Sequence, residues 1–191
     1  MGKVNRRMLI DSFAPNPDAA ETHRIAIAAP PEVVYRTLWT ADLGHSPIIK
    51  LLLALRSLPG FIAHHSLPEN QAITLQTIID SGFGLLAEDP DQELVLGVTG
   101  RFWRAAGNLS PFDRADFEKP VAAGFARAVW NFSLRDSQHD RTILATETRI
   151  ICGDDSSRRK FRVYWILVRP FSGLIRQLML RAVKHECESR G

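Results

Sequence analysis

The residues of this chain best suited to chemistry are charged side chains within predicted strands. Arg101 lies in the stretch VTGRFW, and Glu147 and Arg149 lie in ATETRI. A charged side chain that faces the interior of a protein must be paired or must bind something. We therefore regard these three residues as candidate polar anchors for a ligand.

The sequence leaves open which face of the sheet Glu147 and Arg149 occupy. The two faces of the predicted strand 141–152 have similar apolar content, and a shift of one residue in register exchanges them. Two interpretations remain. Either Glu147 pairs with Arg149 or a neighbouring arginine on the outer face, or it points inward and anchors a ligand.

Motifs of established catalytic or metal sites are absent from the sequence. It has no GxSxG, Walker phosphate loop, GxGxxG, HExxH or paired CxxC. His64 and His65 are adjacent, so they lack the i, i+4 spacing at which two histidines converge on a metal. We therefore predict no catalytic residue set, no metal and no cofactor.

The composition is that of an ordinary globular protein. Of the 191 residues, 45% are hydrophobic and 24% are charged, which is enough apolar material for the core of one domain. No apolar run reaches about 18 residues and no secretory signal pattern opens the chain, so we expect a cytoplasmic protein without a transmembrane segment. Cys152 and Cys187 are then expected to be free thiols.

Positive charge is concentrated at the C-terminus. The net charge is +3, yet residues 156–191 carry nine Lys or Arg against two Glu. Such a segment is typical of a solvated helix face, or of a helix that contacts an anionic partner. Aromatic and basic residues do not alternate as a nucleic-acid surface would require, so we expect no nucleic-acid partner.

Hydrophobic periodicity predicts a strand, two short helices, a run of strands and one long helix. We expect a loosely attached arm at 1–20, and a loop at 105–124 near the mouth of a pocket. Asp154 or Asp155 can cap the long helix, and Pro170 should kink it. The predicted strands are 22–28, 72–80, 83–88, 93–103, 125–136 and 141–152, and the predicted helices are 32–41, 46–58 and 156–188.

This order of elements indicates an α+β fold, because it contains no strand–helix–strand repeat of the parallel classes. A curved antiparallel sheet must bury one face, and only the C-terminal helix is long enough to cover it.

The element order and several stretches resemble the SRPBCC (START/Bet v 1-like) superfamily. Within it they resemble a subgroup whose members look bacterial. The stretches are TADLGHSPIIKLLLALRSLPG, ELVLGVTGRFWR, ARAVWNFSLRD, ILATETRI and the C-terminal helix. The resemblance implies a helix-grip fold, in which about seven antiparallel strands wrap around the C-terminal helix, with two short helices after the first strand. It also implies a single domain over 21–191 and a hydrophobic cavity between sheet and helix.

Large apolar residues would converge in such a cavity, although they can equally fill it as an ordinary core. The helix 46–58 and the loop 105–124 would admit the ligand. The candidate lining residues are Leu52, Leu96, Val98, Phe102, Trp130, Phe132, Phe161, Trp165 and Val168.

Three functions fit these observations. The first is binding or transport of a hydrophobic or amphipathic small molecule, such as a lipid, an isoprenoid or a polyketide-like compound. The second is an enzyme of cyclase, aromatase or hydrolase type that uses the same cavity, although no catalytic motif supports it. The third is an interaction module whose basic C-terminal helix contacts an anionic membrane or an acidic partner. The oligomeric state is not determined by the sequence.

Overall fold

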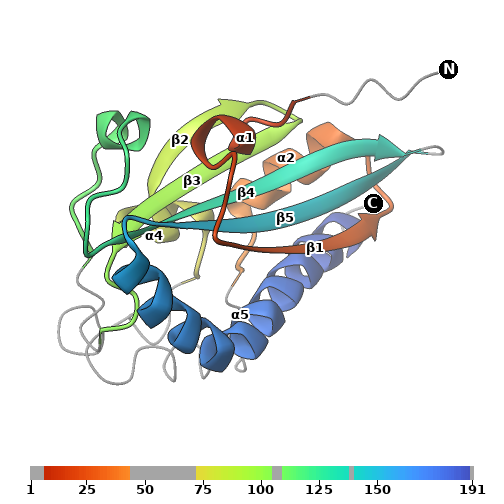
Figure 1. The fold of residues 1–191 in the computed structure, drawn as a ribbon. Coiled ribbons are helices and arrows are strands. Elements are labelled where there is room, and N and C mark those ends of the chain that lie inside the picture. The colour runs from red at the N-terminus through yellow and green to blue at the C-terminus, as the bar shows by residue number, and fades with distance from the viewer. Residues whose placement is uncertain (1–6, 44–71, 105–108, 138–139, 190–191) are drawn as a thin grey trace, which may run out of the picture.

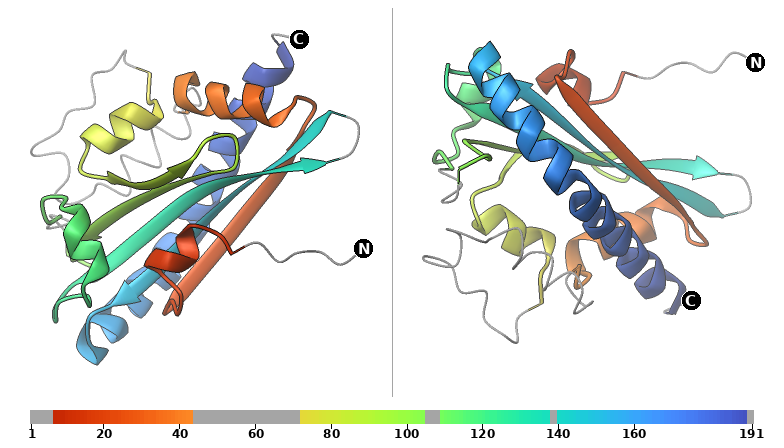
Figure 2. Two further views of the ribbon diagram at one scale, coloured as in Figure 1. Left: turned by 90° about the horizontal axis from the view of Figure 1, so that it is seen from above. Right: turned by 60° about the horizontal axis from the view of Figure 1, so that its bottom comes forward.

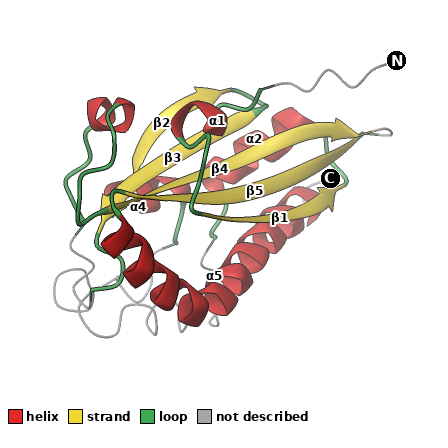
Figure 3. Ribbon diagram, viewed as in Figure 1, coloured by secondary structure: helices red, strands yellow, loops and turns green. Residues whose placement is uncertain are grey.

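The computed structural model describes residues 7–43, 72–104, 109–137 and 140–189. Five antiparallel strands form one sheet, and a long C-terminal helix runs along one of its faces (Figures 1 and 3). The elements are α1 (Ile10–Phe13), β1 (Ala19–Ile27), α2 (Pro31–Thr40), α4 (Leu75–Asp80), β2 (Gly84–Asp89), β3 (Glu93–Gly100), the 3-10 helix η1 (Arg114–Glu118), β4 (Ala126–Ser137), β5 (Arg141–Cys152) and α5 (Asp155–Ser189).

The predicted α+β class is confirmed, but the expected number of strands is wrong. Among the described residues the strand order is β1-β5-β4-β3-β2, which makes five strands rather than seven. The predicted strand 72–80 contains helix α4 instead. There the Thr74 hydroxyl accepts a hydrogen bond from the Thr77 amide at 3.3 Å, an N-cap that starts a helix. The predicted helix 46–58 lies outside the described residues.

The two faces of the sheet pack against different partners. Trp130, Phe132 and Leu134 of β4 lie in the core cluster that includes the buried side of α5. Val129, which directly precedes Trp130 in the chain, lies in the cluster formed with α1 and η1. The predicted alternation of β4 is therefore confirmed, because successive side chains of a strand point to opposite faces. Figure 2 shows α5 and α1 on opposite sides of the sheet.

Helix α5 begins at the cap that the sequence predicts. The Asp154 carboxylate accepts hydrogen bonds from the Ser157 amide at 2.7 Å and from the Gly124 amide. Figure 1 shows that α5 changes direction near its middle, the part of the helix that contains Pro170. Proline lacks an amide hydrogen and clashes with the preceding turn, so a bend there agrees with the predicted kink.

The cap makes the stability of α5 dependent on pH. Hydrogen bonds from the Ser157 and Gly124 amides hold the pKa of Asp154 below its usual value. A lowered folded-state pKa stabilises the protein above the unfolded pKa, near 4, and this contribution is lost as the pH falls through the folded pKa. Asp154→Asn should therefore lower the melting temperature more at about pH 6 than at about pH 3, because the contribution of the ionised carboxylate is lost as the pH falls. Calorimetry at the two pH values checks this, and an equal loss at both would contradict it.

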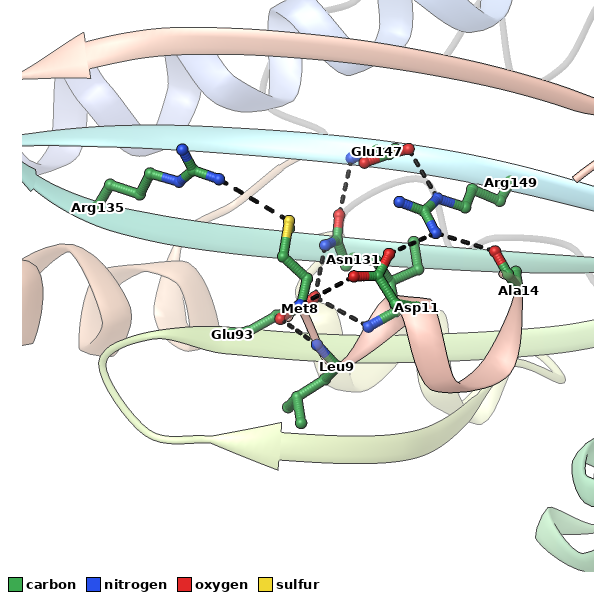
Figure 4. A network of polar contacts seen from close by, with 10 residues as sticks. Met8, Leu9, Asp11, Ala14, Glu93, Asn131, Arg135, Glu147 and Arg149 are labelled. Atoms are coloured by element: carbon green, nitrogen blue, oxygen red, sulfur yellow. Dashed lines mark hydrogen bonds and ion pairs between the residues drawn. The ribbon is translucent and has the colours of Figure 1, made fainter. Parts of the chain in front are cut away.

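The expectation of a loose arm at 1–20 is wrong for residues 8–18. The buried Glu93 carboxylate accepts hydrogen bonds from the amides of Leu9 and Ile10 at 2.6 and 3.2 Å, and from Asn131 Nδ2 at 2.7 Å (Figure 4). Ile10 is fully buried against the outer face of the sheet. The segment is ordered by a carboxylate more than 80 residues away in the chain.

Within the loop 105–124, the 3-10 helix η1 packs on the outer face of the sheet, whereas Gly124 contacts the cap of α5. The buried Arg127 guanidinium donates hydrogen bonds to the carbonyls of Asp116, Phe117 and Lys119 at 2.6, 3.2 and 3.1 Å. It also stacks over the Phe117 ring, 4.5 Å from its centroid. A Cβ at Gly97 would lie 2.4 Å from that ring, so this strand glycine makes room for η1.

Candidate functional site

The interface between the sheet and α5 is apolar at its two ends and polar between them. Along β5, Leu144 belongs to one apolar cluster and Ile150 to another. Thr146 and Thr148 lie between these residues and are buried. On the neighbouring strand β1, His23 pairs with Thr146 and Glu21 pairs with Thr148. The strand register therefore brings Glu21 and His23 to the side of the sheet that α5 covers.

Glu21 and His23 form a closely spaced acid–imidazole pair. His23 Nε2 lies 3.0 Å from Glu21 Oε1, and each side chain is 16% exposed. The other carboxylate oxygen, Oε2, is buried and accepts no hydrogen bond from the described residues. It forms an ion pair with Arg169 of α5, whose Nε is 3.4 Å away and whose side chain is largely exposed.

The pair lines a hollow between β1 and α5. The hollow has a volume of about 450 Å³, is open to solvent, and is lined by Glu21, His23, Arg169, Pro170, Gly173, Leu174 and Gln177. Gly173 allows helix and strand to approach closely, because a Cβ there would lie 2.8 Å from Glu21 Oε1 and 3.4 Å from the His23 ring. The part of α5 that lines the hollow contains its proline.

Trp130 connects this polar region to the core. Its indole Nε1 donates a hydrogen bond to the Thr146 hydroxyl at 2.6 Å, and its ring lies 3.7 Å from the Arg176 guanidinium carbon. The Thr146 hydroxyl donates in turn to the Asn131 carbonyl at 2.8 Å. These hydrogen bonds hold the buried side chains beneath β1 and α5 in fixed positions.

The arrangement can bind a polar group and exchange a proton. An ionised carboxylate only accepts hydrogen bonds, so His23 Nε2 carries the hydrogen that points to Glu21, and Nδ1 is the nitrogen left to accept a proton. Arg169 can donate to an anionic or carbonyl oxygen. No group of three potential metal ligands comes together within the described residues.

Most of the predicted lining residues are buried within the protein. Leu96, Val98, Trp130, Phe132 and Phe161 are at most 3% exposed, and they do not line the hollow between β1 and α5. They also divide between clusters: Leu96, Trp130 and Phe132 belong to one, and Phe102, Phe161 and Trp165 to another. Phe161 stacks on Trp165 with their ring centroids 5.6 Å apart. Val168 is half-buried on α5, and Leu52 lies outside the described residues.

The structure places two of the three predicted polar anchors on the outer face. Arg149 Nε donates to Glu147 Oε1 at 2.7 Å, while Arg149 Nη1 donates to Asp11 Oδ1 at 2.8 Å and to the Ala14 carbonyl at 2.9 Å (Figure 4). Glu147 and Arg149 therefore form an ion pair on the outer face of the sheet. Neither residue can anchor a ligand held beside α5. Arg101 stacks on the Phe125 ring, 4.4 Å from its centroid, and does not line the hollow.

Sequence reasoning missed Glu21 and His23, the residues that line the hollow from β1. A signal was present, because Glu21, His23, Ile25 and Ile27 alternate along one face of a strand that is polar at its start and apolar at its end. This pattern predicts a face that is half in water and half in the core. Glu21 and His23 belong to that face, but the sequence does not show that α5 lies over them.

No family model matches the chain, and no curated protein was found to be similar. Among solved structures it is similar to a hypothetical protein from Helicobacter pylori, at 11% identity and a TM-score of 0.47, with 98% of this chain and 99% of that chain covered. It is also similar to the ZhuI aromatase/cyclase from a Streptomyces species, at 15% identity and a TM-score of 0.33, with 90% and 94% covered. A third similar structure is Ara h 8.0201, at 9% identity and a TM-score of 0.27, with 90% and 98% covered.

Likenesses at this level assign no activity or ligand to the chain. The fold itself, a five-stranded antiparallel sheet with a long C-terminal helix on one face, agrees with the helix-grip arrangement expected from the sequence, apart from the strand count. No described helix is long and apolar enough to cross a membrane.

Proposed function

We propose that this protein binds a small amphipathic molecule in the hollow between β1 and α5. The observation that carries the proposal is the Glu21–His23 pair, mostly buried yet facing a hollow of about 450 Å³. Ligand sites commonly measure about 300–1,000 Å³ and combine apolar walls with a few fixed polar groups. Burying an acid–imidazole pair costs free energy, so its position in a hollow is typical of a binding role.

The lining favours a ligand with a polar head and an apolar body. Glu21 and His23 can fix a hydroxyl or carbonyl group, and Arg169 can pair with a carboxylate or another anionic oxygen. Pro170 and Leu174 offer the apolar wall, where affinity comes from removal of apolar surface from water, at about 25 cal/mol per Å².

Binding is tested by replacing the imidazole. A fluorescent fatty acid, cis-parinaric acid, serves as the probe, since it has a carboxylate head and an apolar body. His23→Leu is expected to weaken its binding about tenfold or more. An imidazole that takes up a proton at Nδ1 can donate it to the carboxylate head, which leucine cannot do, and Glu21 is left without its hydrogen-bond partner. The matched control is His185→Leu, which changes the same residue type at an exposed position of α5 far along the helix.

A second pair of variants tests whether the Glu21 carboxylate contributes to probe binding. Glu21→Gln is expected to weaken probe binding, while Glu118→Gln on the exposed helix η1 leaves it unchanged. Equal binding by His23→Leu and His185→Leu, with wild-type melting temperatures, would show that the probe does not occupy the hollow. Native mass spectrometry of the freshly purified protein then identifies a co-purified ligand by its mass.

The same pair favours a second function, an enzyme in which His23 acts as a general base. The Glu21 carboxylate would orient the imidazole, as the third group of a catalytic triad orients its base. The two functions are separated by turnover of an activated ester, p-nitrophenyl acetate. An enzyme shows a rate that His23→Leu abolishes and His185→Leu keeps, whereas a binding protein shows the same background rate in all three.

A further inference from the structure

Helix α5 has a second apolar face, turned away from the sheet. The side chains of Val163, Ile166 and Leu167 are 73%, 72% and 71% exposed, and those of Phe171 and Leu174 are 45% and 39% exposed. Val163, Leu167, Phe171 and Leu174 follow one another at spacings of four, four and three residues, so they lie along one side of the helix. We call these five residues the outer stripe of α5.

The outer stripe is additional to the side of α5 that packs on the sheet. Phe161, Ser172 and Ile175 lie on that other side and are buried. The helix is thus apolar on both sides from about residue 161 to residue 175, a pattern that is normal for a helix covered all round. Single exposed apolar residues are common on proteins, but a contiguous row marks a contact surface.

The charges around the outer stripe are of one sign. Arg159, Lys160 and Arg162 are exposed on the same half of α5. Between Ser156 and His185 the helix has no Asp or Glu, so no acidic residue of α5 balances them there. Two other arginines of this half are already paired: Arg158 with Asp18 and Asp155, and Arg169 with Glu21.

We propose that the outer stripe docks on the surface of an anionic lipid bilayer, with the helix parallel to the membrane. An exposed ridge of Val, Ile, Leu and Phe flanked by Lys and Arg has the chemistry of an interfacial helix, whose apolar side enters the acyl boundary while its cations contact lipid phosphates. A second copy of the chain is a poorer occupant, because pairing two such faces would bring like charges together.

The docking surface is continuous with the hollow. Leu174 belongs to the outer stripe and also lines the hollow, and Arg169 lines the hollow as well. Docking would therefore place the opening of the hollow beside the bilayer, from which an amphipathic ligand could enter. The membrane contact itself does not depend on the proposed ligand site, since Val163, Ile166 and Leu167 do not line the hollow.

Vesicle flotation tests the proposal. The full chain is expected to float with phosphatidylcholine vesicles that contain about 30% phosphatidylglycerol and to stay in solution with phosphatidylcholine alone. Binding should fall at about 0.5 M salt, which screens the cations. The variant Ile166→Ser/Leu167→Ser should lose about tenfold or more of the bound fraction, while its cis-parinaric acid titration in solution stays at the wild-type value.

A charge-reversal pair is the matched control. Arg159→Glu/Arg162→Glu should abolish flotation, whereas Arg36→Glu/Arg114→Glu, with the same change in net charge at exposed positions of α2 and η1, should retain most of it. Equal flotation with neutral and anionic vesicles, or full binding by the double serine variant, would overturn the proposal. Light scattering that shows a dimer converted to a monomer by the serine substitutions would assign the face to a second copy instead. Binding to poly-L-glutamate without binding to vesicles would assign it to an acidic protein.

Discussion

Phe132→Ala should lower the free energy of unfolding by about 3–5 kcal/mol, the range for removing a large aromatic side chain from a core. Phe132 is fully buried, and its ring centroid lies 4.9 Å from that of Trp130. The core cluster around it includes Leu94 and Met179, from the neighbouring strand and from α5. Its loss leaves a cavity where sheet and helix meet.

Urea denaturation measures this effect, with Phe171→Ala as the matched control. Phe171 is 45% exposed in the outer stripe, so its replacement should change the free energy of unfolding by about 0.5 kcal/mol or less. A small loss for Phe132→Ala, of about 1 kcal/mol, would mean that the surrounding side chains collapse into the space or that the core is less tightly packed than described.

Glu93→Leu should lower the free energy of unfolding by about 3–5 kcal/mol, because a leucine cannot accept the three hydrogen bonds that the carboxylate receives and a buried donor without a partner costs about 1–3 kcal/mol. The donors are the amides of Leu9 and Ile10 and the side-chain amide of Asn131. Ile10 and Asn131 are fully buried, so water does not replace the lost acceptor unless α1 leaves the sheet.

Hydrogen exchange identifies which element moves. The amides of Leu9 and Ile10 should exchange faster in Glu93→Leu, whereas those of β4 and β5 keep their order of protection. Glu118→Leu, at an exposed position of η1, is the control and should leave both the stability and the exchange of α1 unchanged. Unaltered exchange at Leu9 and Ile10 would contradict the role assigned to Glu93.

Local patterns were sufficient to predict the central strands and the C-terminal helix. The alternation of Trp130 and Phe132 with polar neighbours predicted both β4 and the side that faces α5, because the period of a strand is two residues. The cap at Asp154 and the apolar spacing along α5 predicted its start and its length within about two residues. The order of these elements predicted the α+β class and a helix over one face of the sheet.

Long-range contacts decided the features that the sequence did not predict. Whether Glu147 and Arg149 face α5 or the outside depends on the register between β4 and β5, and neither of the two faces of β5 is apolar enough to decide it. Helix α1 is ordered by Glu93, a contact that local periodicity cannot reveal.

Long-range contacts also decided which residues form the candidate sites. Glu21 and His23 become a site because β1 pairs with β5, from the other end of the chain, and because Gly173 lets α5 approach them. The outer stripe of α5 is exposed because the helix has two apolar sides and the sheet covers only one of them. The sequence by itself thus determined the central strands, the C-terminal helix and their order, since those depend on neighbouring residues. The tertiary structure decided which side chains meet and which stay exposed, since that depends on strand register and on the rotation of one helix against the sheet.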